Sequence, residues 1–123
     1  MAEKKVAYEV DGRPFEGMIV YDDSVKGKRP AIYMQPDWKG VCADTIGQAR
    51  EVAGKEYVVL MADMFGAGYG AKPKNQDELR AGMLAVHKNL PFTLACGAKA
   101  YEALLGEAQK LGVADTEIGR AHV

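Results

Sequence analysis

Residues that cross-link small proteins or perform redox and metal chemistry are scarce in this sequence. The 123 residues include two cysteines, Cys42 and Cys96, and two histidines. The cysteines lack the paired spacing of a zinc site or a redox motif, and two cysteines do not make a disulfide framework. We therefore expect both thiols to be reduced and to act as small apolar side chains. Nothing in the pattern indicates a metal or a cofactor.

Charge of one sign and long apolar runs are also lacking. The 16 basic and 17 acidic residues give a formal net charge of -1, so no basic surface for nucleic acid or anionic lipid is indicated. Residues 1–10 carry charges where a signal peptide needs an apolar run, and no segment approaches the roughly 20 apolar residues of a membrane span. We expect a cytoplasmic protein with no nucleic-acid or membrane partner.

The composition that remains is that of an ordinary globular protein. Hydrophobic residues make up 48% of the chain and charged residues 27%. A chain of this length should bury roughly two-thirds of the surface that its unfolded form exposes. We expect a single domain over residues 1–123.

The first sixty residues alternate between apolar runs and turn chemistry. Residues 5–10 and 15–21 flank the sequence DGRP and predict a β-hairpin. Residues 31–34 and 57–61 are apolar throughout, which is typical of strands covered on both faces. A helix between these two runs is predicted from Thr45, which forms a capping-box pattern with the glutamine three residues later. A strand, helix, strand succession favours a parallel right-handed crossover, and hence an α/β fold with a mixed sheet.

Glycines are concentrated in residues 65–70, directly after the last of these runs. This is where α/β proteins place binding loops. Asn75 and Glu78 then form a second capping-box pattern, which predicts the start of a helix that Pro91 interrupts.

The last third of the chain is predicted to be mainly helical. Residues 93–111 repeat apolar positions at helical spacing, and Gly112 is placed to end that helix. Residues 118–123 could begin one more strand.

Motifs at three places, taken in order, resemble the first half of dienelactone hydrolases, a family of α/β-hydrolases. They are YEVDG with FEG at residues 8–12 and 15–17, DWKG at residues 37–40, and YVVL with ADMFG at residues 57–60 and 62–66. The resemblance implies a truncated α/β-hydrolase fold, with a mixed, mostly parallel sheet, an N-terminal hairpin and flanking helices. It also implies a carboxylic ester or lactone hydrolase, acting on a small ester or lactone only if the remaining half is supplied.

The resemblance assigns site roles to two residues. Acyl transfer in this fold needs a nucleophile on a strained turn, a histidine, an acid and two backbone N–H groups for the oxyanion. By resemblance, the Trp38 amide provides one of those N–H groups, and Asp37 matches a glutamate, one methylene longer, that contacts the nucleophile. From the residues alone, Asp37 could instead form an Asx turn and Trp38 could be a packing residue. Asp63, at the end of a strand, fits a structural hydrogen-bonding role.

The rest of the catalytic machinery is missing from the sequence. The family continues after residues 118–119 into a glycine, aromatic, cysteine elbow, whereas this chain reads RAHV and ends. His87 falls within a predicted helix and His122 lies at the terminus. Cys42 could have its pKa lowered by the start of a helix, but no histidine lies near it in the sequence. We expect this chain alone to be inactive.

Ending before the elbow has a structural consequence as well. In the family the elbow strand pairs with the third strand, so its loss would expose an apolar edge at residues 31–34. We expect a homodimer that joins at this edge or exchanges residues 118–123. The chain is then either part of a hydrolase or a non-catalytic module that acts as an oligomer or as the partner of another polypeptide. A frameshift at residues 120–123 is a further explanation of the ending.

Overall fold

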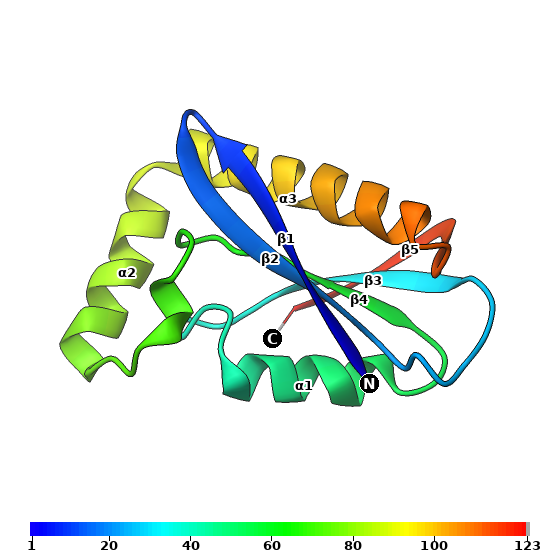
Figure 1. The fold of residues 1–123 in the computed structure, drawn as a ribbon. Helices are drawn as coiled ribbons and strands as arrows, with labels where there is room; N and C mark the ends of the chain where they lie inside the picture. The colour runs from blue at the N-terminus through cyan, green and yellow to red at the C-terminus, as the bar shows by residue number, and fades with distance from the viewer. Residues whose placement is uncertain (123) are drawn as a thin grey trace.

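A five-stranded mixed sheet forms the centre of the molecule, with strand order β1-β2-β4-β3-β5 (Figure 1). The computed structural model describes the backbone of residues 1–122 and the side chains of residues 1–115. The strands are β1 (Ala2–Val10), β2 (Arg13–Tyr21), β3 (Arg29–Gln35), β4 (Val58–Met61) and β5 (Ala114–His122). β2 runs antiparallel to both β1 and β4, whereas β3 is parallel to β4 and to β5. The predicted α/β class with a mixed sheet is confirmed.

The N-terminal hairpin turns over two residues. Asp11 and Gly12 have φ angles of 50° and 78°, so both lie in the left-handed region that two-residue hairpin turns require. Val10 and Arg13 are paired directly across the turn. The predicted hairpin is confirmed, and its strands extend further than the apolar runs that indicated them.

Helices cover both faces of the sheet, which gives three layers. The helical elements are α1 (Ala43–Ala53), the short 3-10 helix η1 (Tyr69–Ala71), α2 (Gln76–Lys88) and α3 (Leu90–Lys110). Figure 1 shows α1 on one face of the sheet and α3 on the other, with α2 at one end of the molecule. Among the described residues, no helix has both the length and the apolar character that crossing a membrane requires.

The helix starts test the two capping-box predictions. At α2 the pattern is confirmed, because the Glu78 N–H donates to Asn75 Oδ1 at 2.8 Å and the Asn75 N–H donates to Glu78 Oε1 at 3.1 Å. At α1 the expectation that Thr45 begins the helix is wrong, since Cys42 is the N-cap. Thr45 lies three positions later, and its hydroxyl accepts the Cys42 N–H at 2.9 Å.

The two faces of the sheet bury different kinds of side chain. The core under α3 is rich in aromatic residues, and it contains Tyr8, Phe15, Tyr21 and Tyr33. The core under α1 holds methionine, alanine and valine, namely Met18, Met34, Met61, Ala49, Ala53, Val20 and Val59. Each face of the central strands is therefore covered by its own hydrophobic cluster.

The far end of the sheet differs from the expectation of an open edge at residues 31–34. β5 pairs in parallel with β3 along that stretch, with Ala31 opposite Ile118 and Gln35 opposite His122. The exposed edge predicted at β3 is therefore wrong, because residues 114–122 themselves form the neighbouring strand. The strand expected at residues 118–123 is present to His122, and Val123 lies outside the described residues.

Candidate functional site

The chain makes a tight turn directly after β3, at residues 37–40. The Gly40 N–H donates to the Asp37 carbonyl at 3.0 Å, which closes a β-turn. The Lys39 N–H donates to Asp37 Oδ1 at 2.9 Å, which is the Asx-turn arrangement. The carboxylate of Asp37 is thus engaged with local backbone, while the rest of the side chain is half-buried at the carboxyl end of a parallel strand.

Trp38 occupies the second position of this turn and presents an unused backbone donor. Among the described residues, no acceptor bonds its N–H. Its carbonyl, in contrast, accepts a hydrogen bond from the Tyr69 hydroxyl at 3.0 Å. The turn is therefore anchored through the carbonyl of Trp38 while the amide N–H stays available to a ligand.

The first turn of α1 holds the other end of this segment. The fully buried Thr45 hydroxyl donates to the Gly40 carbonyl at 2.7 Å while it accepts the Cys42 N–H. An exposed ion pair between Lys39 and Asp44, at 3.0 Å, adds a second link and raises the pKa of the lysine. Helix α1 therefore fixes where residues 37–40 lie relative to the sheet.

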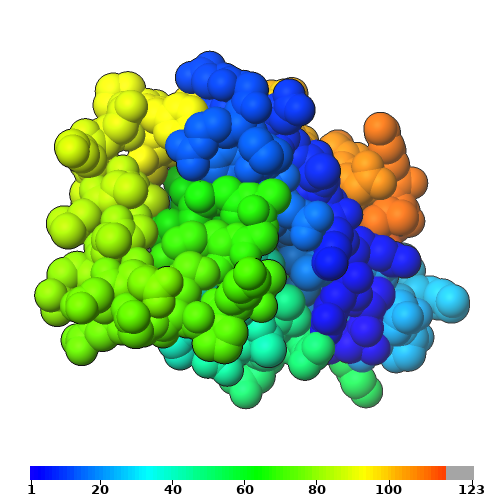
Figure 2. Space-filling view, turned by 60° about the vertical axis from the view of Figure 1, so that its left-hand side comes forward, coloured from blue at the N-terminus to red at the C-terminus, as the bar shows by residue number. Residues whose placement is uncertain are grey.

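The glycine-rich loop after β4 packs against the same turn. The ring of Tyr69 stacks on that of Phe65, with centroids 4.3 Å apart and planes 14° from parallel. Burial, with a smaller contribution from Glu78, raises the pKa of Tyr69, so the hydroxyl keeps its proton. Figure 2 shows the loop and α2 forming a continuous surface beside the β1–β2 hairpin. The sequence predicted a loop near the site but not the contact of Tyr69 with a residue 31 positions away.

Asp63 has the structural role that the sequence predicted. Its Oδ1 accepts the N–H groups of Phe65 and Gly66, each at 3.0 Å, and its Oδ2 accepts the Glu16 N–H at 2.9 Å. Its own N–H and carbonyl both bond the hydroxyl of Tyr8, at 2.9 and 2.8 Å. The side chain is buried and all of these bonds are internal, so Asp63 stabilises the exit of β4 and the hairpin together.

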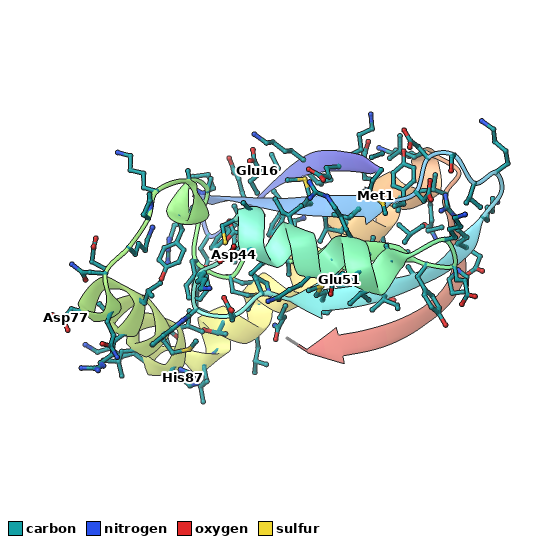
Figure 3. All side chains as sticks on the ribbon, turned by 90° about the horizontal axis from the view of Figure 1, so that it is seen from below. Met1, Glu16, Asp44, Glu51, Asp77 and His87 are labelled. Carbon is teal, nitrogen blue, oxygen red and sulfur yellow. The ribbon has the colours of Figure 1, made fainter. Side chains whose placement is uncertain are left out.

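The other sequence candidates do not assemble into a catalytic group within the described residues. His87 is exposed on α2, with its Nδ1 2.9 Å from the Met83 carbonyl. Figure 3 shows it well apart from Asp44 in the first turn of α1. Cys42 is a half-buried free thiol at the N-cap of α1, and burial raises the pKa of the second free thiol, Cys96. The side chain of His122 lies outside the described residues.

No group of three or more histidine, cysteine, aspartate or glutamate residues in the described part of the chain is arranged to hold a metal ion. At the end of β3 the Trp38 N–H is a donor that suits an anionic or carbonyl oxygen.

Comparison with known proteins identifies the fold. No protein-family model matches the chain, and no curated protein matches it significantly. Among solved structures it is similar to a protein named m3DLH, with 21% identity and a TM-score of 0.81. It is also similar to a dienelactone hydrolase-like promiscuous phosphotriesterase from metagenomic libraries, with 20% identity and a TM-score of 0.80. Each match covers 98% of this chain and 48% of the other.

The chain is also similar, at lower identity, to an esterase. The structure of esterase Est22 is 15% identical with a TM-score of 0.62, and the match covers 98% of this chain and 34% of the esterase. The chain spans about half the length of the first two structures and about a third of the length of the esterase. Almost all of this chain is matched in each case. The chain therefore has the fold of about half of a dienelactone hydrolase-like α/β-hydrolase.

Proposed function

We propose that this chain supplies part of the acyl-transfer site of a dienelactone hydrolase-like carboxylic ester or lactone hydrolase. The observation that carries the proposal is the unpaired N–H of Trp38, presented on a braced turn at the carboxyl end of a parallel strand. Open α/β sheets bind ligands at that end of their strands. The resemblance of the surrounding DWKG motif to the turn after the third strand of dienelactone hydrolases supports the same role.

The chemistry assigned to the turn is stabilisation of an oxyanion. When a nucleophile attacks an ester carbonyl, the C=O bond becomes a C–O⁻ single bond, and backbone N–H groups aimed at that oxygen lower the barrier. Trp38 would provide one of these donors. Asp37 would lie beside the nucleophile. Its Oδ1 accepts the Lys39 N–H, which leaves Oδ2 for the contact with the nucleophile.

The nucleophile, the acid and the histidine would come from outside this chain. No serine or cysteine in the sequence has the G-x-[SC]-x-G setting of a nucleophile elbow. We therefore expect p-nitrophenyl acetate to be hydrolysed no faster in the presence of this chain alone than in buffer. Hydrolysis above that rate that disappears in a Cys42→Ala variant would contradict the expectation.

The role of Trp38 is tested in a completed enzyme. In a chimaera, this chain replaces the matching part of the phosphotriesterase from metagenomic libraries, and p-nitrophenyl acetate hydrolysis is measured. Trp38→Pro deletes the N–H yet suits the second position of a β-turn, so kcat should fall by roughly 10²–10³, the cost of one oxyanion donor. Trp38→Ala keeps the N–H and should retain most of the activity. Equal activity of the proline and alanine variants would overturn the assignment.

A second candidate function is that of a non-catalytic module that self-associates. In the described backbone β5 is the last strand of the sheet order, next to β3, and strands at the edge of a sheet recruit further strands. The partner would be a second copy, whose β5 would continue the sheet. Light scattering at micromolar concentration should then give a dimer, and a stable monomer would exclude this function.

Adjacent proline substitutions locate the contact. Successive N–H groups along a strand point to opposite edges, so one of Ile118→Pro and Gly119→Pro removes an outward donor and the other removes a donor to β3. We expect one variant to become monomeric with a native circular dichroism spectrum and the other to lose structure. Two folded dimers would rule out pairing through this edge.

A further inference from the structure

The side chain of Tyr69 links its own loop to the turn at residues 37–40, which is distant in the sequence. Its hydroxyl donates to the Trp38 carbonyl at 3.0 Å, and its ring lies against Phe65 of its own loop. The ammonium group of Lys74 lies 4.2 Å from the ring centroid and bonds the Tyr69 carbonyl. A hydrogen bond, a stacked ring and a cation therefore all act on one residue.

Glycines lie next to the Tyr69 side chain at positions where a residue with a Cβ would not fit. A Cβ at Gly40 would lie 2.8 Å from the Tyr69 ring, and Gly40 also has a φ of 73°. A Cβ at Gly82 of α2 would come under 3.0 Å from the Tyr69 hydroxyl, and a Cβ at Gly70 would come under 3.0 Å from the Val41 carbonyl. The turn after β3, the loop after β4 and α2 thus approach one another more closely than side chains allow.

Close packing of this kind restricts the positions that the hydroxyl can occupy. Phe65 stacks on one face of the ring, Gly40 lies against the edges of both rings, and the backbone at Gly82 bounds the hydroxyl. The hydroxyl in turn bonds the carbonyl of Trp38, and that carbonyl lies in the same residue as the unused N–H. Rotation of the peptide plane between Trp38 and Lys39 would require this bond to break. The Trp38 N–H lies in the preceding plane, whose Asp37 carbonyl accepts the Gly40 N–H, so the two bonds together restrain the backbone on both sides of Trp38.

We propose that Tyr69 is the positioning residue that holds the Trp38 N–H in the orientation needed for an oxyanion. The proposal rests on the oxyanion role proposed for Trp38. It adds a coupling: a movement of α2 or of the glycine-rich loop would reach the turn through Tyr69. The loop and α2 therefore set the geometry of the donor without touching the substrate.

The first test uses Trp38 as a fluorophore, because it is the only tryptophan in the chain. Tyr69→Phe keeps the ring but removes the hydroxyl. We expect the acrylamide quenching constant of Trp38 to rise and its steady-state anisotropy to fall, while circular dichroism stays native. Tyr57→Phe is the matched control and should leave both readouts unchanged. Wild-type quenching and anisotropy in Tyr69→Phe would overturn the proposal.

A second variant disturbs the hydroxyl without changing the tyrosine. Gly82→Ala places a methyl group against the hydroxyl and should displace it, with the same change in quenching as Tyr69→Phe. Gly106→Ala on α3 is the matched control, because a Cβ there meets nothing within 4 Å. A Gly82→Ala variant with wild-type fluorescence would show that the hydroxyl is not confined as proposed.

The completed chimaera separates failure of this inference from failure of the proposed function. Tyr69→Phe should lower kcat and leave KM near its original value, because the bond shapes a donor used in the transition state. If the chimaera responds to Trp38→Pro but not to Tyr69→Phe, the positioning role is wrong and the oxyanion role stands. If Tyr69→Phe changes the fluorescence while Trp38→Pro keeps full activity, the oxyanion role is wrong and Tyr69 only braces a turn.

Discussion

The two loops that leave parallel strands β3 and β4 are stabilised by different kinds of group. At the loop after β4 a buried carboxylate is central, because Asp63 accepts three backbone N–H groups, and Tyr8 of β1 bonds its main chain. At the turn after β3 the backbone carbonyls of Trp38 and Gly40 accept the hydroxyls of Tyr69 and Thr45.

The difference shows which loop is free to act on a ligand. The donors around Asp63 are already bonded and partly buried, so they contribute to folding stability. The N–H of Trp38 has no acceptor among the described residues, although its neighbours on both sides are held. A braced turn with one free donor is the arrangement that a preorganised oxyanion site needs.

The largest effect should come from removing the carboxylate of the β4 loop. Asp63→Ala deletes three charge-assisted bonds and leaves their donors partly buried, so the free energy of unfolding should fall by about 3–5 kcal/mol. Urea unfolding followed by circular dichroism measures the loss. Asp63→Asn, which keeps one carbonyl acceptor, should lose less, and an equal loss in both variants would mean that the hydrogen bonds are not the cause.

Removing the hydroxyl that bonds Asp63 should have the next largest effect. Tyr8→Phe keeps the ring stacked on Phe15 but leaves the N–H and carbonyl of Asp63 without their partner. Because both groups are buried, we expect a loss of about 2 kcal/mol in the same unfolding experiment. Tyr57→Phe is the control, and a loss as small as that of the control would indicate that water replaces the hydroxyl.

The same tyrosine should make the fold sensitive to alkali. Burial is the main cause that raises the pKa of Tyr8 above its ordinary value of about 10, so the folded protein holds this proton more tightly than the unfolded chain does. The contribution of the Tyr8 proton to the free energy of unfolding is complete below pH 10 and decreases as the pH rises further. Between pH 10 and 11 the wild type should lose about 1 kcal/mol more stability than Tyr8→Phe. If the free energy of unfolding of the wild type and of Tyr8→Phe changed equally with pH, the role of this proton would be contradicted.

The smallest effect is expected at the carboxylate of the β3 turn. Asp37→Ala removes one local bond, to the Lys39 N–H, at a half-exposed position, so the loss of stability should be about 0.5–1 kcal/mol. Asp37→Asn keeps an acceptor and should be nearly neutral. A loss that approaches that of Asp63→Ala would remove the contrast between the two loops.

Local chemistry made much of the fold predictable. The hairpin turn at Asp11 and Gly12 and the capping box of Asn75 with Glu78 depend on residues close in sequence, and both are present. The start of α1 was misplaced because Thr45 suits an N-cap, whereas Cys42 occupies that position and Thr45 bonds back to it.

Contacts between distant residues could not be predicted in the same way. Pairing of β5 with β3 joins residues more than eighty positions apart, so the apolar run at residues 31–34 indicated a buried strand but not its neighbour. At the candidate site, Asp37 and Trp38 were identified by a motif, whereas Tyr69 was not. Its role depends on a bond across 31 residues and on clearances at glycines that belong to separate segments.

The core under α1 has one more consequence, for how the protein tolerates change. Met18, Met34 and Met61 face Ala49 and Ala53 of the helix, so long flexible thioethers fill the space between small side chains. Such a layer can rearrange when a neighbour is replaced, whereas the stacked aromatic rings under α3 cannot. These thioethers are buried, so an oxidant reaches them only when the layer opens, and a sulfoxide formed then would place a polar oxygen in a fully apolar cluster. The adaptable side of the sheet is thus also the side on which a single added oxygen would be most disruptive.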